Sequence, residues 1–133
     1  MTWKRIVLTI VLAALFYAGC NTQSMLATEE FFRDENPNLA LTPKVCYWLG
    51  DAAYWTFRYD LAIDIIGRNL KDFPYEDGAA DQEYKRALCY EKNGDYQRAI
   101  GLFETYLVHY PKDSRYISIQ DRITKLRIYG KAS

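Results

Sequence analysis

The sequence predicts an all-α fold, and three observations support that prediction. The 133 residues include only four prolines and seven glycines, too few turn-forming residues for a sandwich or barrel of short strands. A pattern of small and large apolar residues precedes Pro74 and recurs before Pro111, 37 residues later. Apolar residues at both ends of the repeated region follow helical spacing rather than alternation. We therefore expect a stack of paired helices.

Composition and charge limit the function classes. Half of the residues are hydrophobic and 26% are charged, which predicts one folded unit rather than a disordered tail. Lys and Arg together number 17, and so do Asp and Glu. This balance removes the broad positive field that drives non-specific binding to nucleic acid.

Residues 1–19 have the pattern of an export signal. A basic start at Lys4 and Arg5 is followed by an apolar run and by small residues before Cys20. As a helix, Ile6 to Gly19 would cover roughly 20 Å, less than the roughly 30 Å of a bilayer core. A permanent membrane span is therefore disfavoured. An uncleaved anchor, and a plain secretory signal with an incidental cysteine, remain as alternatives.

The end of that segment, Tyr17-Ala18-Gly19-Cys20, resembles the lipobox of bacterial lipoproteins, although Tyr17 replaces the usual leucine. The resemblance implies cleavage after Gly19 and a covalent lipid on Cys20, which would anchor the chain to a bilayer. Asn21, the next residue, implies transfer to the outer membrane by the same resemblance. Cleavage would leave 15 basic and 17 acidic groups, so the lipid rather than charge would hold the chain to the membrane.

Residues 20–41 are interpreted as a lipidated tether that contains a short helix of about two turns, ended before Pro37. Residues 42–130 are the predicted repeat domain. Thr42 is expected to cap its first helix, with Pro43 at the first helical position. Asp113-Ser114 is a similar start signal for the last helix.

Alignment on Pro74 and Pro111 defines two copies of the repeat. The matched pairs include Leu49-Gly50 with Arg86-Ala87, Ala53 with Tyr90, Tyr59 with Tyr96, Ala62-Ile63 with Ala99-Ile100, and Ile66 with Phe103. The second copy resembles the tetratricopeptide repeat in Ala87, Tyr90, Gly94-Asp95-Tyr96, Ala99-Ile100, Phe103 and Pro111. The first copy departs from it, since Phe57-Arg58 replaces the Gly-Asp turn and Asn69 occupies a usually small position.

The repeat has a physical reading as antiparallel helix pairs. Small residues such as Gly50 and Ala99 let two helices approach closely, while Tyr90 and Phe103 fill the space between them. Residues 115–128 are predicted to form a capping helix with an apolar face of Tyr116, Ile119, Ile123 and Leu126. The expected architecture is an α-α superhelix of two repeats plus this C-terminal helix.

The first helix of each repeat carries the predicted binding site. In proteins that resemble this repeat, those helices line a concave groove. Here the candidate peptide-binding residues are Tyr47, Asp51, Tyr54, Arg58, Tyr84, Leu88 and Glu91. Tyrosines offer rigid contact area with a polar end, which suits an extended or helical peptide. Alternatively, these tyrosines pack on the tether or stay solvated. Trp48 and Trp55 are expected to flank this groove, as core residues rather than as contacts.

Catalytic chemistry finds little support in the sequence. His109 is the only histidine, and the chain has no catalytic triad, glycine-rich phosphate loop or metal-spaced cluster. We therefore expect no enzyme activity, no metal and no cofactor besides the lipid on Cys20. Cys46 and Cys89 are expected to be buried, unpaired thiols, and a disulfide between them remains the alternative.

These features resemble the tetratricopeptide-repeat lipoproteins that face the periplasm in outer-membrane protein assembly, in cell-division coordination and as pilotins. The resemblance implies a membrane-anchored, non-enzymatic adaptor in the bacterial cell envelope, on the outer membrane facing the periplasm. Its partner would be a protein or peptide of an envelope assembly complex, and no nucleic acid. The alternative is a structural subunit of a secretion or pilus complex whose groove is filled by its own N-terminal segment.

Overall fold

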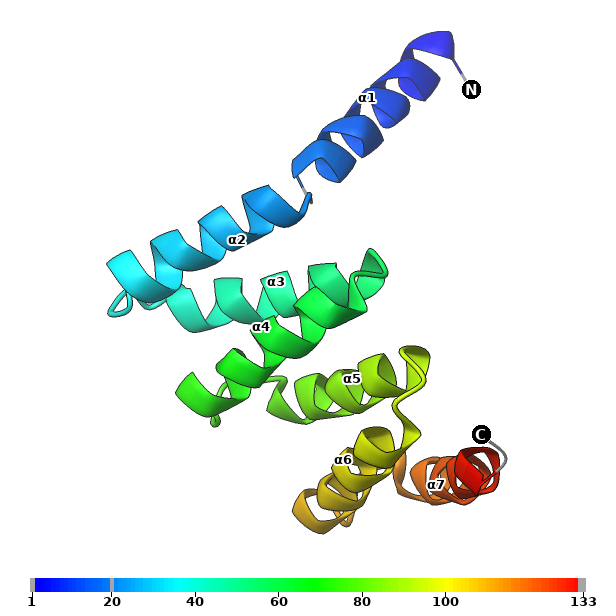
Figure 1. Ribbon diagram of the computed structural model, residues 1–133. Helices are drawn as coiled ribbons and strands as arrows, with labels where there is room; N and C mark the ends of the chain where they lie inside the picture. The colour runs from blue at the N-terminus through cyan, green and yellow to red at the C-terminus, as the bar shows by residue number, and fades with distance from the viewer. Residues whose placement is uncertain (1, 20, 132–133) are drawn as a thin grey trace.

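The computed structural model describes residues 2–19 and 21–131, and these residues form a stack of helices (Figure 1). The elements, in order, are α1 (Trp3–Gly19), α2 (Thr22–Glu30), the π-helical turn η1 (Phe31–Glu35), α3 (Thr42–Trp55), α4 (Tyr59–Asp72), α5 (Ala79–Lys92), α6 (Tyr96–His109) and α7 (Tyr116–Lys131). The described residues include no strand. The predicted all-α fold of repeat hairpins is confirmed.

Two hairpins, α3–α4 and α5–α6, form the repeats, and α7 follows them as the predicted capping helix. Small residues lie where the helices cross: Gly50, Ala53, Ala62, Ala87 and Ala99 are all buried. At Gly50 a Cβ atom would stand 2.8 Å from Gln82 Oε1 and 2.9 Å from Ile66 Cγ1. A larger side chain would therefore push α3 away from its neighbours.

Large apolar residues fill the remaining space of the second repeat. Phe103 and Tyr106 of α6 are fully buried, and they pack with Ile119, Ile123 and Leu126 of α7. The apolar face predicted for the last helix is thus confirmed for these three residues, while Tyr116 is half-buried. The capping helix closes the core at this end of the stack.

The turn of the second repeat forms as its sequence predicts. Gly94 adopts φ +79°, and the Asp95 carboxylate accepts a hydrogen bond from the backbone N–H of Arg98 at 3.2 Å. The first repeat has the same left-handed conformation at the equivalent position, but Phe57 adopts it, with φ +61°. An L-residue with a side chain rarely takes this conformation.

Two predicted helix starts need correction. Pro43 lies in the first turn of α3 as expected, but Thr42 is not the cap, because its hydroxyl donates a hydrogen bond to the Asn36 carbonyl at 2.7 Å. α7 begins at Tyr116, two residues after Ser114. The Asp113 carboxylate accepts from the Arg115 N–H at 2.8 Å, and the Arg115 hydrogen bonds lower the pKa of Asp113 to about 2.

Residues 22–35 are the main departure from the predicted tether. α2 and η1 together span 14 residues, as α4 and α6 do, and their starts at residues 22, 59 and 96 are 37 residues apart. Met25 is 2% exposed and belongs to the same core cluster as Leu49, Ala52 and Ala53 of α3. The segment therefore occupies the place of a second repeat helix that precedes α3. The stack contains an additional half-repeat rather than a tether with a short helix.

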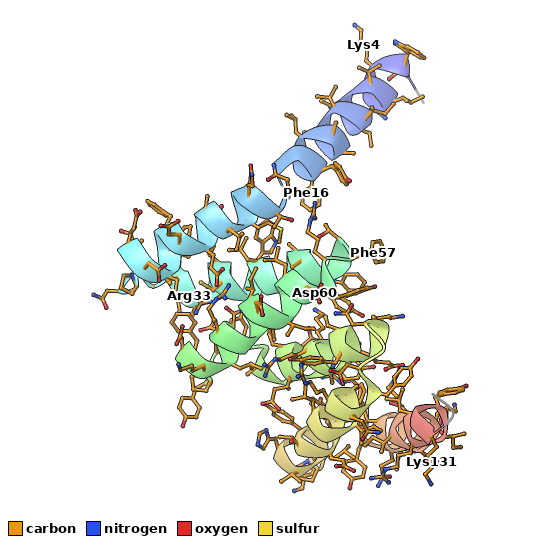
Figure 2. The ribbon with its side chains drawn as sticks, in the orientation of Figure 1. Lys4, Phe16, Arg33, Phe57, Asp60 and Lys131 are labelled. Carbon is orange, nitrogen blue, oxygen red and sulfur yellow. The ribbon has the colours of Figure 1, made fainter. Side chains whose placement is uncertain are left out.

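Charged groups fasten this half-repeat to the first hairpin (Figure 2). Glu29, 5% exposed, accepts hydrogen bonds from Arg68 Nη2 at 2.7 Å and from Arg33 Nε at 3.1 Å. Arg33 also donates to the Asp72 carboxylate at 2.5 Å and to Asn69 Oδ1 at 2.6 Å. Because Glu29 and Arg33 are almost fully enclosed, their pairing depends on the packed position of α2.

The same polar chain continues into the second repeat. Asn69 Nδ2 donates to Gln82 Oε1 at 2.9 Å and to the Cys46 carbonyl at 2.8 Å. Gln82 Nε2 in turn donates to the Asp51 carboxylate at 2.6 Å. Asn69, unusual at a position that is small in most repeats, is therefore fully satisfied by hydrogen bonds in the interior.

α1 projects from the stack, and its described side chains are exposed (Figure 1). Taken singly, none of the described helices has both the length and the apolar character needed to cross a membrane. The bent pair of Trp3–Tyr17 and Thr22–Glu35 passes that test by length and composition. Cys20, the predicted lipidation site, lies outside the described residues.

Candidate protein-binding face

One side of α3, α5 and α7 is turned away from the second helices of the repeats. We call it the first-helix face and define it by Trp48, Trp55, Lys85, Lys92, Arg122 and Tyr129, which are three pairs related by the 37-residue period. On α3, the opposite side holds Cys46, Leu49, Gly50 and Ala53, which are buried against α4. The core therefore leaves most of this face exposed. Lys85 is the exception, since only 11% of its side chain is exposed.

Two tryptophans dominate the face at α3. Trp48 is 53% exposed and Trp55 is 67% exposed, so the expectation that they belong to the core is wrong. They are seven residues apart, which places them on the same side of the helix, about 10 Å apart along its axis. Exposed tryptophans give large, rigid contact area, and such residues carry much of the binding energy in protein interfaces.

Lys85 joins these tryptophans to α5. Its Nζ atom lies 2.9 Å from Asp51 Oδ1 and 2.6 Å from Asp81 Oδ2. The same atom lies 5.6 Å from the centre of the Trp55 ring and 5.8 Å from that of Tyr54. Burial lowers the pKa of Lys85, but the hydrogen bonds to Asp81 and Asp51 outweigh it and leave the pKa raised. The lysine is held charged beside the aromatic rings.

The predicted groove residues lie between the helices instead. Tyr47 is 6% exposed and Leu88 is 8% exposed, so neither can line an open groove as predicted. The Tyr47 hydroxyl donates to the Phe73 carbonyl at 2.5 Å. Tyr54 is half-buried and packs against both core clusters. Tyr47 thus joins α3 to the end of α4, Leu88 belongs to the core of the second repeat, and Tyr54 connects the two cores.

The other predicted groove residues have similar roles. Asp51 accepts from Gln82 and Lys85, and the Glu91 carboxylate accepts from Arg122 Nη1, 2.9 Å from each oxygen. The Arg115 guanidinium lies 4.8 Å from the centre of the Tyr84 ring. Arg58 lies half-buried at the cap of α4, away from the first-helix face. The structure brings these side chains together across α3, α5 and α7, mainly as inter-repeat contacts.

Helical geometry explains the difference between the predicted and the open faces. Helical spacing predicts a core side of the α3 segment that holds Cys46, Leu49, Gly50, Ala53 and Phe57, with the groove on the other side. Phe57 departs from this prediction, since it is 77% exposed. A first helix in a stack must bury two sides, however, because it packs against its own second helix and against the next first helix. Tyr47, Asp51 and Tyr54 lie on the side of α3 that makes the second of these contacts, with α5. Trp48 and Trp55 are displaced around the helix by about one residue, or 100°, and are left open.

The buried ionisable groups predict a loss of stability in alkali. Burial raises the pKa of Cys89, Tyr47 and Tyr106 to about 12 each. In the unfolded chain these groups release their protons from about pH 8.5 to 10 upward, whereas the folded chain retains them. The free energy of unfolding should therefore be unchanged below about pH 8 and fall steadily between about pH 9 and 12.

Urea unfolding at a series of pH values measures this slope. Tyr47→Phe should flatten the slope above about pH 10, while Tyr75→Phe, at a residue that is 98% exposed, should leave it unchanged. Equal slopes in the two variants would show that burial of Tyr47 does not contribute to the pH dependence.

Other candidate chemistry is sparse among the residues that the structure describes. They include no group of three or more His, Cys, Asp or Glu side chains placed to hold a metal ion. Cys46 and Cys89 are free and buried, as the favoured interpretation predicts. His109 ends α6, with Nδ1 3.0 Å from Glu83 Oε2. A hollow of about 290 Å³ between α5 and α7 extends the first-helix face, lined among others by Glu91, Arg122, Lys125 and Tyr129.

The N-terminal segment does not fill this face. Residues 22–35 pack beside α3 and α4 and leave both tryptophans exposed. The alternative in which the groove is occupied by the chain's own N-terminal segment is therefore wrong for residues 22–35. This alternative is wrong because residues 22–35 occupy the place of a second repeat helix, and they do not lie across the first helices.

Comparison with known proteins agrees with the fold. A family model described as tetratricopeptide repeat matches residues 83–113, which cover most of α5, all of α6 and the first part of the loop after it. No curated protein matches the chain significantly. The chain thus contains a tetratricopeptide repeat, a unit that generally mediates contacts between proteins.

Proposed function

We propose that this repeat-containing chain is a lipid-anchored, non-enzymatic adaptor that binds a segment of a partner protein on its first-helix face. The observation that carries the proposal is the exposure of Trp48 and Trp55 on the one side of α3 that the core does not use. More than half of each tryptophan's surface stays in contact with water, and that part contributes nothing to the free energy of folding. Their area becomes useful when a partner covers it.

The chemistry of the face favours one class of ligand. Lys85 Nζ lies 5.6 Å from the centre of the Trp55 ring, and Arg122 and Lys125 line the hollow that also holds Tyr129. Lys92 lies on α5, in line with Lys85. An extended or helical peptide with apolar or aromatic residues and interspersed carboxylates complements this mixture. Several of the cations are already paired with Asp51, Asp81, Glu91 or Asp121, so apolar contact would supply most of the affinity.

The envelope location follows from the N-terminal sequence. The lipobox-like Tyr17-Ala18-Gly19-Cys20 supports acylation of Cys20, and Asn21 supports delivery to the outer membrane. The adaptor would then work in the periplasm, in envelope or outer-membrane protein assembly. Its half-repeat, α2 with η1, would place the repeats directly beside the anchor without a long flexible linker.

Photo-cross-linking followed by binding measurements tests the face. A photoreactive amino acid at Lys92 should yield one dominant cross-linked protein in intact cells, whereas the same group at Tyr75 should not. With that protein purified, Trp48→Ala/Trp55→Ala should weaken binding by about 2–4 kcal/mol, roughly 30-fold to 1000-fold, because exposed tryptophans act as binding hot spots.

The matched control is Phe31→Ala/Tyr75→Ala, which removes two exposed aromatic side chains outside the first-helix face. It should leave the affinity within about twofold, since near-neutral contacts surround a hot spot. Helix content should be unchanged in both double variants. If the tryptophan variant keeps wild-type affinity, the first-helix face is not the binding site.

A further inference from the structure

One edge of the stack carries the turns between the first and second helices of the repeats. We call it the turn edge and define it by Asn21, Phe57 and Gly94, which start or precede α2, α4 and α6. The sequence position 37 residues before Phe57 is Cys20. The predicted acylation site thus corresponds in the repeat to Phe57 of the first turn and to Gly94 of the second.

The contacts of α2 place its start at the same edge as the turn after α3. The Thr42 hydroxyl, at the beginning of α3, faces the carbonyls of Phe32 and Asn36 at the other end of this segment. Figure 1 shows α2 and α3 running in opposite directions, and Met25, near the start of α2, belongs to the same core cluster as Ala52 and Ala53 near the end of α3. The two helices are therefore antiparallel, and Figure 2 shows Phe57 at the end of the stack from which α1 departs.

The conformation and exposure of Phe57 show that this side chain contributes little to the stability of the fold. Its backbone has φ +61°, a conformation that is strained for a residue with a Cβ atom and suited to glycine. Its side chain is 77% exposed, and its ring contacts the edge of Tyr59 with the centres 6.3 Å apart. The equivalent residue of the second repeat is glycine. In the first turn, Phe57 therefore has a strained backbone conformation, and its apolar ring is exposed to solvent.

Trp55 lies next to this turn, at the margin of the first-helix face, and can report on a lipid contact of Phe57. It is 67% exposed and ends α3, two residues before Phe57. Tryptophan and other aromatic residues favour the interface between a bilayer and water, where a ring can lie among the headgroups. A chain that is already anchored needs only a weak additional contact, because the anchor makes insertion of the turn an intramolecular step.

We propose that the turn edge inserts Phe57 into the interface of the bilayer that holds the acylated Cys20, while Trp55 stays part of the first-helix face. This inference rests on the lipid anchoring in the proposed function, and its occupant is the lipid surface itself. The contact would orient the stack with the turn edge on the membrane. The first-helix face around Trp48 would then stand clear of the lipid and open to the partner.

Fluorescence quenching in vesicles tests the inference with the full chain. The acylated protein, its modification checked by the mass of the Cys20 peptide, is incorporated into phosphatidylcholine vesicles that carry a quencher near the headgroups. Trp3→Phe/Trp48→Phe leaves Trp55 as the reporter, and Trp3→Phe/Trp55→Phe leaves Trp48 as its matched control two helical turns away. Trp55 should lose at least about half of its emission, and Trp48 less than about a tenth.

Phe57→Gly separates the lipid contact from folding. Glycine accepts the left-handed conformation, so this variant should unfold at the same temperature or higher. In the Trp55 reporter chain it should reduce quenching by at least about half, because the ring that inserts next to Trp55 is gone. Quenching that persists at the full level in this variant would contradict the role of Phe57.

Two failures can be told apart. A chain without lipid on Cys20, which does not float with the vesicles, overturns the anchoring in the proposed function and this inference with it. A chain that is acylated and floats, but whose Trp55 is quenched no more than Trp48, overturns this inference alone.

Discussion

Replacing Phe103 by alanine is expected to lower the free energy of unfolding by about 3–5 kcal/mol. Phe103 is fully buried between α5, α6 and α7, and it packs against Tyr84 with the ring centres 6.0 Å apart. The variant would lose the apolar burial of the ring and leave a cavity between helices that small residues already hold close together. Urea unfolding followed by circular dichroism measures the change.

Two control variants show whether the loss of stability comes from a cavity in the core. Phe103→Leu keeps most of the volume and should cost less than about 1.5 kcal/mol. Val108→Ala alters a residue of the same helix that is 78% exposed and should stay within about 0.5 kcal/mol. A loss below about 1.5 kcal/mol for Phe103→Ala would show that α6 and α7 do not share a close-packed core.

Replacing Glu29 by alanine is expected to cost about 3 kcal/mol, the lower end of the range for breaking a buried ion pair. The carboxylate is 5% exposed, and its loss removes the acceptor for both Arg33 and Arg68. Arg33 would remain almost enclosed, while Arg68 is 44% exposed at its side chain and can turn to water, which moderates the cost. Thermal and urea unfolding of the variant measure the change.

Glu30→Ala is the matched control, because it removes the same group from the neighbouring, exposed residue of α2. It should stay within about 0.5 kcal/mol of the parent chain. If Glu29→Ala costs no more than Glu30→Ala, residues 22–35 are not part of the cooperative stack, and their description as a tether would stand.

The half-repeat was present in the sequence as a weak signal. Pro37 precedes Pro74 by the same 37 residues that separate Pro74 from Pro111, and Asn21 precedes Asp95 by twice that number. The N-cap role of Asp95 is repeated at Asn21, whose side chain accepts from the Ser24 N–H at 2.9 Å. The signal was missed because the small residue of the later copies, Ala62 or Ala99, is replaced here by Met25.

The position of Met25 also has a structural reason. A second helix normally packs against its own first helix and the next one, and a small residue lets all three approach. The structure places α2 against α3 and α4, and α1, which precedes it, projects from the stack with exposed side chains. Met25 is long enough to reach Leu49, Ala52 and Ala53 from α2. The small residue found at Ala62 and Ala99 is therefore missing in α2, the helix at the N-terminal end of the stack.

The candidate binding face could be predicted only in part. The sequence correctly directed attention to α3, α5 and their aromatic residues, because helical spacing separates the apolar core side from the rest. It selected Tyr47, Tyr54 and Tyr84, which the structure holds between repeats, and assigned Trp48 and Trp55 to the core. Residue type was a poor guide here, because an aromatic ring suits a packed interface and an open face equally well.

By itself, the sequence determined the all-α class, the second repeat, the buried free thiols and the apolar side of the last helix. Each of these depends on local spacing, on glycine and proline, or on the size of a side chain at a fixed offset. Only the tertiary structure decided which side of each first helix stays open and that residues 22–35 belong to the stack. Those outcomes depend on the angle at which each helix meets its neighbours, and that angle results from the packing of residues far apart in the chain.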